Sequence, residues 1–276
     1  MSEATGARRI LVVGRNSFLA GHLLAVLPPE QVVAVGHREI DRPDLLDGIG
    51  CIVNFACHPA SGHDDYDLAG ADPDARLAHR IGGREIAYVM LSSRKVYAPG
   101  SIPLGEAAPI GPSDAYGRNK LAAEERLRDL LGPRLTILRL ANIFGYERDP
   151  RRRTFLSLSL ALLAKKGRIH YDMRPFVARD FLPVERAAEL LARIAAAPPG
   201  GVLNLGSGIP LPAGRIALWI LEGFGRGELV IGSPEERDPF VLDVAKLRAL
   251  YGEPCSIEEL RARCLAIGRR LAEELA

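Results

Sequence analysis

The sequence lacks the features that mark several classes of protein. Its 276 residues include 36 Lys and Arg against 34 Asp and Glu, and a net charge of +2 does not indicate a nucleic-acid partner. The apolar runs are broken within about a dozen residues, which is too short to span a bilayer. The start of the chain also lacks the apolar core of a signal peptide. These absences predict a cytoplasmic protein without a nucleic-acid or membrane partner.

Cysteine is scarce and is not spaced for a metal or a redox pair. No CxxC motif is present, and the cysteines lie in apolar or helical contexts, so we expect them to be reduced and mostly buried. They are Cys51, Cys57, Cys255 and Cys264. The segment 58–65 contains two histidines and two aspartates, but a polar loop explains it better than a metal site, which would need paired ligands. No metal is predicted.

What the sequence does contain is an alternation of strands and helices. Short runs of β-branched and other apolar residues are typical of the buried strands of a parallel sheet. These runs occur at 8–13, 31–35, 51–57, 86–91, 135–140 and 202–205. Helical segments separate most of them, and this alternation predicts an α/β fold with a doubly wound parallel sheet, in which ligands bind at the carboxyl ends of the strands.

The first strand leads into a candidate phosphate-binding turn. The turn and the helix that follows it contain Gly14, Arg15, Ser17, Phe18 and Leu19. Backbone N–H groups and the N-terminus of the helix favour an anion in such a turn. Two of the three glycines of a GxxGxxG pattern are replaced here, the second by Ser17 and the third by an alanine. The pattern is therefore a weak indication of a dinucleotide site.

The end of the second strand bears on the choice of cofactor. An NAD site usually carries Asp or Glu at this strand end, where the carboxylate binds the ribose 2′-hydroxyl, and the first acid here is Glu39. Arg38, together with Arg15, is suited to binding a 2′-phosphate through charge-assisted hydrogen bonds. The sequence therefore favours NADP, used as NADPH, over NAD.

Tyr116 and Lys120 form a candidate acid–base pair. They lie four residues apart among helix formers, so their side chains leave one face of a helix. A neighbouring cation favours the phenolate, and we expect Lys120 to lower the pKa of Tyr116 from about 10 toward working pH. This spacing alone is common on exposed helices. Two hydroxyls, those of Ser92 and Ser93, end the fourth strand at the edge where such folds bind ligands.

Taken together, these motifs resemble the extended short-chain dehydrogenase/reductase family, which comprises nucleotide-sugar epimerases, dehydratases and reductases. The likeness covers nearly the whole chain and rests on the segments 14–23, 54–57, 91–97, 116–120, 139–145, 179–184 and 203–208. The resemblance implies a Rossmann-type dinucleotide-binding domain at 1–145, to which 176–205 partly returns. It also implies a smaller, mostly substrate-binding subdomain at 146–276, and a homodimer.

The resemblance also implies roles for individual positions. Ser93 matches the hydroxyl that holds the reacting oxygen, and Tyr116 matches the acid–base phenol. Lys120 matches the residue that lowers the pKa of this tyrosine and holds the nicotinamide ribose. Phe55 and Ala56, after the third strand, match cofactor-binding positions. The positions expected to contact the nucleotide-sugar substrate are Arg94, Asn142 and Arg237.

Family membership leaves the reaction open, because function resides in the site and not in the fold. Arg94 and Lys95 stand where sugar dehydratases of the family carry an acidic pair, which argues against dehydration. Epimerases of the family usually keep the glycine turn and an acid after the second strand, and the sequence has neither. The favoured reading is NADPH-dependent reduction of a keto group on a nucleotide-activated sugar, of the 4-ketoreductase type.

Two alternatives stay open. One is an NAD-dependent nucleotide-sugar epimerase. The other is a non-catalytic family member with a degenerate cofactor turn. Ser17 favours this second alternative, as does the absence of any Asn between Ala56 and Leu91, where the family commonly supplies one to its proton relay. The presence of Ser93, Tyr116 and Lys120 argues against it.

Overall fold

The structure is a computed structural model that describes residues 8–66, 72–100, 103–148 and 154–276. The chain divides into two compact units. Unit 1 comprises Met1–Gly100, Glu106–Leu140 and Ala188–Leu205, and unit 2 comprises Ser101–Gly105, Ala141–Ala187 and Gly206–Ala276.

Unit 1 is built on a six-stranded sheet in which every pair of neighbouring strands is parallel. The strands are β1 (Arg9–Val13), β2 (Val32–Val35), β3 (Ile49–Asn54), β4 (Ala87–Ser93), β5 (Leu135–Leu140) and β10 (Gly201–Leu205). Their order is β10-β5-β4-β3-β1-β2. This arrangement confirms the predicted doubly wound sheet.

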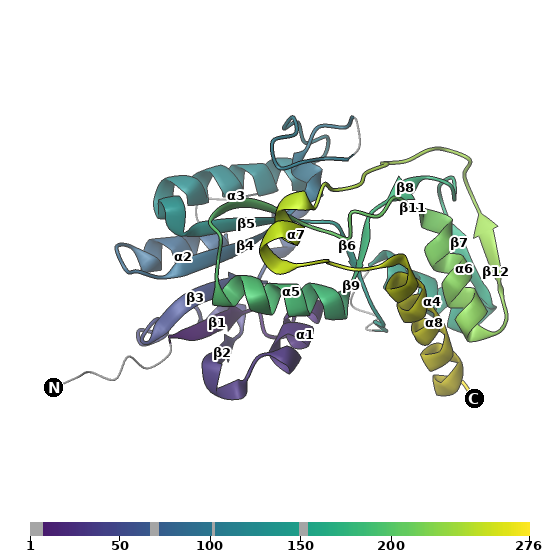
Figure 1. Ribbon diagram of the computed structural model, residues 1–276, viewed down its shortest axis with the longest axis horizontal. Helices are drawn as coiled ribbons and strands as arrows, with labels where there is room; N and C mark the ends of the chain where they lie inside the picture. Colours follow the sequence, from purple (N-terminus) through teal and green to yellow (C-terminus); the bar gives the residue numbers. More distant parts are fainter. Residues whose placement is uncertain (1–7, 67–71, 101–102, 149–153) are drawn as a thin grey trace. The chain divides into compact units, whose positions relative to one another are not determined.

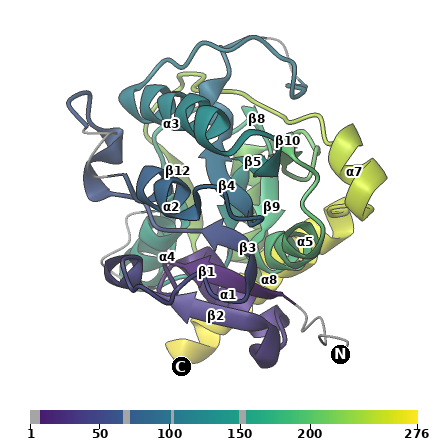
Figure 2. The ribbon, with the colours of Figure 1, turned by 90° about the vertical axis from the view of Figure 1, so that its left-hand side faces the viewer.

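Helices cover both faces of this sheet (Figures 1 and 2). On one face lie α2 (Pro73–Ile81) and α3 (Ala115–Leu131), and on the other lie α1 (Phe18–Val26) and the part of α5 (Val184–Ala196) that belongs to unit 1. Burial on both faces explains why the strands read as nearly continuous apolar runs. The core under α2 and α3 includes Leu77, Ile81, Leu127 and Leu131 from the helices and Leu11, Ile52, Tyr88 and Ile137 from the strands.

Unit 2 contains three short two-stranded sheets. They pair β6 (Asn142–Phe144) with β9 (Phe181–Pro183), β7 (Arg168–Tyr171) with β12 (Glu228–Ile231), and β8 (Ala178–Arg179) with β11 (Leu211–Pro212). Its helices are α4 (Phe155–Lys166), α6 (Ala213–Phe224), α7 (Ala245–Tyr251) and α8 (Ile257–Glu274). Glycines permit the backbones of α6 and α8 to touch: a Cβ at Gly268 would lie 2.1 Å from the Ile220 carbonyl oxygen.

The buried carboxylate of Asp180 organises the centre of unit 2. It accepts hydrogen bonds from the backbone N–H groups of Ser207 at 2.8 Å, Gly208 at 3.1 Å and Leu242 at 3.2 Å. A Cβ at Gly206 would lie 2.5 Å from its Oδ2 atom, so this turn requires glycine. Two of the segments that carry the family resemblance, 179–184 and 203–208, are thus joined through one side chain.

All four cysteines are free, and all but Cys57 are buried. Within the described ranges, no helix combines the length and apolar character needed to cross a membrane.

Candidate active site

The turn after β1 is pressed against the end of β3. Gly14 has a φ of +85°, a backbone conformation that residues other than glycine rarely adopt. A Cβ at this position would also lie 2.8 Å from the backbone nitrogen of Ala56 and 3.0 Å from the carbonyl carbon of Phe55. Only glycine fits, for both reasons. The structure therefore brings together Gly14, Phe55 and Ala56, which the sequence assigned to cofactor binding.

Ser17 begins α1 without closing its N-terminus. It occupies the N-cap position, but its hydroxyl makes no capping hydrogen bond. The backbone N–H of Ser17 donates a hydrogen bond to the Gly14 carbonyl at 2.8 Å. Leu19 is buried, and the Phe18 ring packs edge-on against His22 with ring centroids 5.0 Å apart. The first N–H groups of the helix are thus not covered by the Ser17 side chain, and a helix N-terminus of this kind favours an anion.

The first acid that follows β2 in the sequence lies at the end of that strand. A short 3-10 turn, His37–Glu39, brings the Glu39 carboxylate back to the backbone N–H of Gly36 at 2.7 Å. The same carboxylate forms an ion pair with Arg15 at 2.9 Å. Arg38 is exposed. The end of β2 therefore carries a carboxylate as well as two guanidinium groups, because the turn folds a residue three positions further along the chain into the place where an acid was missing.

A tight contact joins the start of α3, which carries Tyr116, to the turn that follows Ser93. Ser93 ends β4, and its hydroxyl accepts the Lys95 N–H at 3.2 Å. The helix α3 begins directly before Tyr116, and a Cβ at Gly117 would lie 2.4 Å from the Lys95 carbonyl oxygen. This glycine lets the start of the helix pack against the turn after Ser93. Asp114 caps the helix and forms an ion pair with the Lys95 ammonium.

Lys120 lies one turn further along the same face of α3. Its ammonium donates to the Leu91 carbonyl on β4 at 2.9 Å and lies 6.0 Å from the centroid of the Tyr116 ring. The helix is thereby fixed to the strand that ends in Ser93. The structure places the hydroxyl, the phenol and the ammonium in one region at the carboxyl edge of the sheet.

The expected pKa of Tyr116 is wrong in direction. Burial raises the pKa of Tyr116 above its ordinary value, and this effect outweighs the opposing effect of Lys120. For Lys120 itself, burial acts to lower the pKa, but nearby acidic groups, Tyr116 first among them, hold it above its ordinary value. Both shifts favour the protonated forms, an ammonium at Lys120 and a phenol at Tyr116.

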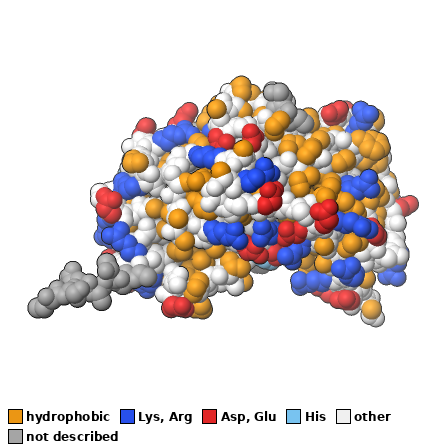
Figure 3. Space-filling model, in the orientation of Figure 1, with side chains coloured by type: hydrophobic (Ala, Val, Ile, Leu, Met, Phe, Trp, Pro, Cys, Tyr) orange, Lys and Arg blue, Asp and Glu red, His pale blue; other side chains and the backbone are white. Residues whose placement is uncertain are grey.

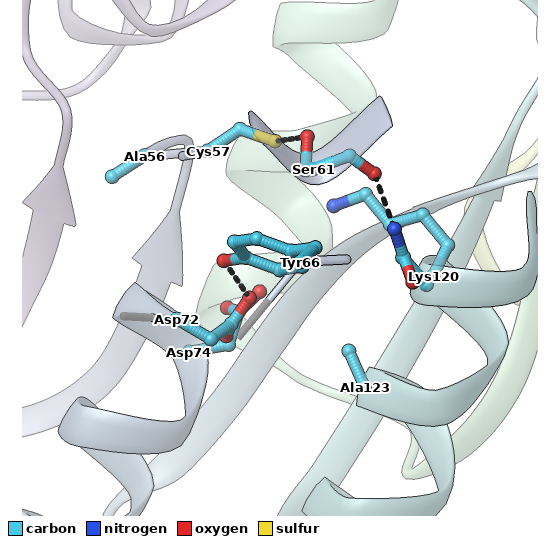
Figure 4. Close-up of a pocket in the computed structure, with 9 residues that line it drawn as sticks. Ala56, Cys57, Ser61, Tyr66, Asp72, Asp74, Lys120 and Ala123 are labelled. Carbon is cyan, nitrogen blue, oxygen red and sulfur yellow. Dashed lines mark hydrogen bonds between the residues drawn. The ribbon is translucent and has the colours of Figure 1, made fainter. Parts of the chain in front are cut away.

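A small polar cavity adjoins Lys120, and the sequence did not reveal it (Figure 4). Its lining includes Asp72 and Asp74, at the start of α2, and Tyr66, whose phenol donates to Asp72 at 2.8 Å. Oδ1 of Asp74 accepts hydrogen bonds from the Asn54 amide at 2.7 Å and from the Tyr88 phenol at 2.6 Å. Two features of the sequence point to this cavity: Asn54 is a polar residue within the apolar run 51–57, and Asp74 is an acid within a predicted helix.

A larger cavity, of about 400 Å³, lies in unit 2. Its lining combines apolar side chains with Arg179, Arg237 and Asp172. Arg237 is paired with Glu235 at 2.7 Å and with Asp172 at 3.1 Å. The remaining lining residues are Phe155, Leu158, Ser159, Leu162, His170 and Met173. Arg237, which was predicted to contact the substrate, thus lines this cavity.

The other two predicted substrate residues lie elsewhere. Asn142 begins β6, is half-buried, and donates its backbone N–H to the Asp180 carbonyl at 3.2 Å. Arg94 is half-buried in the turn after Ser93 in unit 1. Neither lines the cavity around Arg237.

On the face shown in Figure 3, basic and acidic side chains are interspersed, in keeping with the small net charge. Among the residues that the structure describes, no three His, Cys, Asp or Glu side chains are grouped as metal ligands.

Comparison with known sequences identifies relatives over much of the chain. The NAD dependent epimerase/dehydratase family matches residues 10–206. A dTDP-4-keto-6-deoxy-D-glucose reductase of Streptomyces niveus is 32% identical over an alignment of 157 residues, and the alignment covers 50% of this chain and 53% of that protein. A UDP-glucose 4-epimerase of Azospirillum brasilense is 30% identical over an alignment of 190 residues, and the alignment covers 56% of this chain and 54% of that protein. The chain spans about half the length of the curated relatives it matches.

A solved structure shows the same fold. MoeE5 in complex with UDP-glucuronic acid and NAD superposes with a TM-score of 0.79 at 21% identity, over 95% of this chain and 99% of that one. At this identity the likeness concerns the fold alone.

Proposed function

The chain belongs to the NAD dependent epimerase/dehydratase family, and from that premise we propose that it reduces a keto group on a nucleotide-activated sugar with NADPH. The observation that supports the proposal is the packing of α3, which carries Tyr116 and Lys120, against β4 and the turn that follows Ser93. Unit 1 would bind the dinucleotide and unit 2 the nucleotide part of the substrate. A homodimer remains a prediction.

The residues of unit 1 fit a dinucleotide. Gly14 brings the backbone of the first turn against Phe55 and Ala56, where a Cβ would collide. The N-terminus of α1 favours the pyrophosphate, since the Ser17 hydroxyl does not cap it. Arg15 and Arg38 would hold a 2′-phosphate, and Lys120 the nicotinamide ribose. When bound, the cofactor supplies the hydride.

The side chains of the chain supply the proton and its placement. Ser93 would donate a hydrogen bond to the ketone oxygen, and Tyr116 would give that oxygen its proton as the alkoxide forms. The raised pKa of Tyr116 keeps the phenol protonated before the reaction. The Lys120 ammonium would stabilise the phenolate that remains after transfer.

The residues after Ser93 support reduction over dehydration. Loss of water from a sugar needs an acid and a base near the reacting carbons, and the two positions after Ser93 are Arg94 and Lys95. The Lys95 ammonium is already paired with Asp114. Arg94 would then contact the substrate, and in unit 2 Asn142 and Arg237 would contact its diphosphate, for which a guanidinium is well suited.

NAD-dependent epimerisation is a second candidate, and Glu39 favours it. A carboxylate at the end of β2 is the group that accepts a hydrogen bond from the ribose 2′-hydroxyl of NAD. A carboxylate there also repels a 2′-phosphate. The second candidate would be supported by NAD that copurifies with the protein.

A cofactor and substrate panel tests the proposal. Fluorescence titration with NADPH and NADH measures binding, and thermal shift with a set of nucleotide sugars finds ligands, since a ligand of the folded state raises its apparent stability. We expect Tyr116→Phe to keep NADPH affinity and to lose roughly 10²–10⁴-fold in turnover. Unchanged turnover would refute the role of Tyr116, and failure to bind either cofactor would favour a non-catalytic protein.

A further inference from the structure

A second cavity in unit 2, of about 140 Å³, lies between α8 and the ends of β6 and β9. In Figure 1, α8 runs beside β9. The lining comes from the end of β6 and the loop after it, from the first turn of α5, and from one face of α8: Phe144, Gly145, Tyr146, Glu185, Arg263, Ala266, Ile267 and Arg270. The cavity shares no lining residue with the larger one around Arg237.

Two of the lining residues belong to a network of paired side chains. Glu274, near the end of α8, accepts hydrogen bonds from the Tyr146 phenol at 2.5 Å and from Arg148 at 3.0 Å. The guanidinium of Arg270 lies 4.1 Å from the centroid of the Tyr146 ring and donates to Glu274 at 3.3 Å. The charges of this network are therefore satisfied within the protein.

Arg263 and Glu185 are different. Both are half-buried at the cavity. Within the part of the chain that the structure describes, neither side chain forms a hydrogen bond or an ion pair, whether with the other or with a third residue. The dipole of α5 accounts for an acid in its first turn, but it does not account for a guanidinium at the same cavity. Charged groups drawn partly out of water are unfavourable without a partner, so both groups have hydrogen-bonding capacity for a ligand.

The size and the other walls of the cavity limit what such a ligand can be. A cavity of ~150 Å³ holds one benzene molecule, so about six non-hydrogen atoms fit here. Phe144 and Ile267 are buried apolar side chains, and Ala266 leaves room beside them. A matching ligand is therefore small, with an anionic group for Arg263, a cationic group for Glu185 and a short apolar part.

We propose that this cavity binds a free α-amino acid with a small side chain. The Arg263 guanidinium binds the carboxylate through two parallel N–H···O hydrogen bonds, for which its planar shape is suited. The Glu185 carboxylate accepts hydrogen bonds from the ammonium group, and the side chain contacts Phe144 and Ile267. This inference does not rest on the proposed function, because no lining residue of this cavity has a role in that reaction.

Calorimetric titration of the full chain tests the proposal with three probes, glycine, L-alanine and L-serine. Each is compared with the hydroxy acid of the same skeleton: glycolate, L-lactate and L-glycerate. Inorganic phosphate is titrated as an anion without a cationic group. We expect at least one amino acid to bind with a Kd of about 1 mM or lower, and its hydroxy acid to bind about 10-fold more weakly, because the ion pair with Glu185 is lost.

Five variants locate the site. Arg263→Gln and Glu185→Gln should each raise the Kd of the amino acid about 10-fold or more, since each loses a charge-assisted interaction. Ala266→Leu should abolish binding by filling the cavity. Arg269→Gln and Glu273→Gln are the matched controls, because these exposed positions of α8 do not line the cavity, and they should leave the Kd unchanged.

The variants should also fold, and this can be checked without a ligand. Because Arg263 and Glu185 have no partner within the described chain, their replacement by Gln should not lower the Tm of the ligand-free protein. A ligand of the folded state raises the Tm, so the amino acid should raise it for the unaltered protein and for the two controls but not for Ala266→Leu.

Three results would overturn the proposal. The first is the absence of binding by all three amino acids. The second is binding of the hydroxy acid or of phosphate as tight as that of the amino acid, since the cavity would then recognise an anion alone. The third is an unchanged Kd in both Arg263→Gln and Glu185→Gln, which would place the site elsewhere. None of these measurements depends on turnover of a nucleotide sugar, so the failure of either proposal leaves the other standing.

Discussion

Glu124 and Arg139 form a fully buried ion pair directly behind the candidate active site. The guanidinium of Arg139, on β5, donates to both carboxylate oxygens of Glu124, at 2.7 and 3.1 Å, and their side chains are 3% and 0% exposed. Ser92, next to Ser93, donates to the same carboxylate at 2.5 Å. Glu124 lies eight residues after Tyr116 and four after Lys120, on the same face of α3. The pair therefore sets the rotation of this helix against β4 and β5.

Replacing Glu124 by Gln should destabilise the protein strongly. The substitution leaves the Arg139 guanidinium buried beside a neutral group, and breaking a buried pair in this way costs about 3–5 kcal/mol in free energy of unfolding. Glu125→Gln is the matched control, because Glu125 is exposed on the next position of the same helix and should change the value by no more than ~0.5 kcal/mol. Urea unfolding measures both. Equal stability of the two variants would contradict this role of the pair.

Gly117→Ala should separate Tyr116 from Ser93. The added Cβ would lie 2.4 Å from the Lys95 carbonyl oxygen, so the start of α3 must move off the turn that follows β4. We expect a loss of about 1–3 kcal/mol in stability and a fall in turnover with little change in cofactor affinity. Gly83→Ala is the control, since nothing lies within 4 Å of the added carbon there. Turnover equal to that of the control would show that the close approach does not matter for the reaction.

Glu39→Gln should raise the preference for NADPH over NADH. The change removes the negative charge that strengthens a hydrogen bond from a ribose 2′-hydroxyl and repels a 2′-phosphate, and it frees Arg15 from its ion pair. A charge-assisted hydrogen bond contributes about 1.5–3 kcal/mol, so the ratio of the two dissociation constants should move by roughly 10-fold or more. Glu30→Gln, an exposed acid just before β2, provides the comparison. If the ratio of the two dissociation constants is unchanged in both variants, residues other than Glu39 determine the choice of cofactor.

The sequence predicted what depends on short-range periodicity. The strands and the four-residue spacing of Tyr116 and Lys120 follow from local patterns, and the structure has both. Glu39 was identified as the first acid after the second strand, but its position at the end of β2 was not predicted because it depends on the geometry of a 3-10 turn. The direction of the pKa shift of Tyr116 was wrong because burial, which dominates it, depends on tertiary packing. Asp74 was missed for the same reason: its neighbours Asn54 and Tyr88 lie on different strands.

Burial raises the pKa of Asp74, and this shift predicts how stability depends on pH. An acid whose pKa is higher in the folded than in the unfolded state binds more protons when folded, so stability falls as the pH rises between the two values. For Asp74 the pKa rises from 3.8 in the unfolded chain to about 6 in the folded protein. This difference corresponds to a loss of roughly 3 kcal/mol in free energy of unfolding across that pH interval. Because other carboxyl groups titrate in the same range, the quantity to measure is the difference between the unaltered protein and Asp74→Asn, by urea unfolding from pH ~3 to pH ~8.

The difference in free energy of unfolding between the unaltered protein and Asp74→Asn should change in one direction only as the pH rises. Relative to Asp74→Asn, which cannot ionise at this position, the unaltered protein should lose stability with rising pH and level off once the folded carboxyl is fully ionised above pH ~7. Asp129→Asn, at an exposed position on α3, should show no such loss. A flat difference for Asp74→Asn would mean that Asp74 is as easily ionised in the folded protein as in the unfolded chain. A carboxyl of that kind would be an anion at neutral pH, and its charge would favour the ammonium form of Lys120.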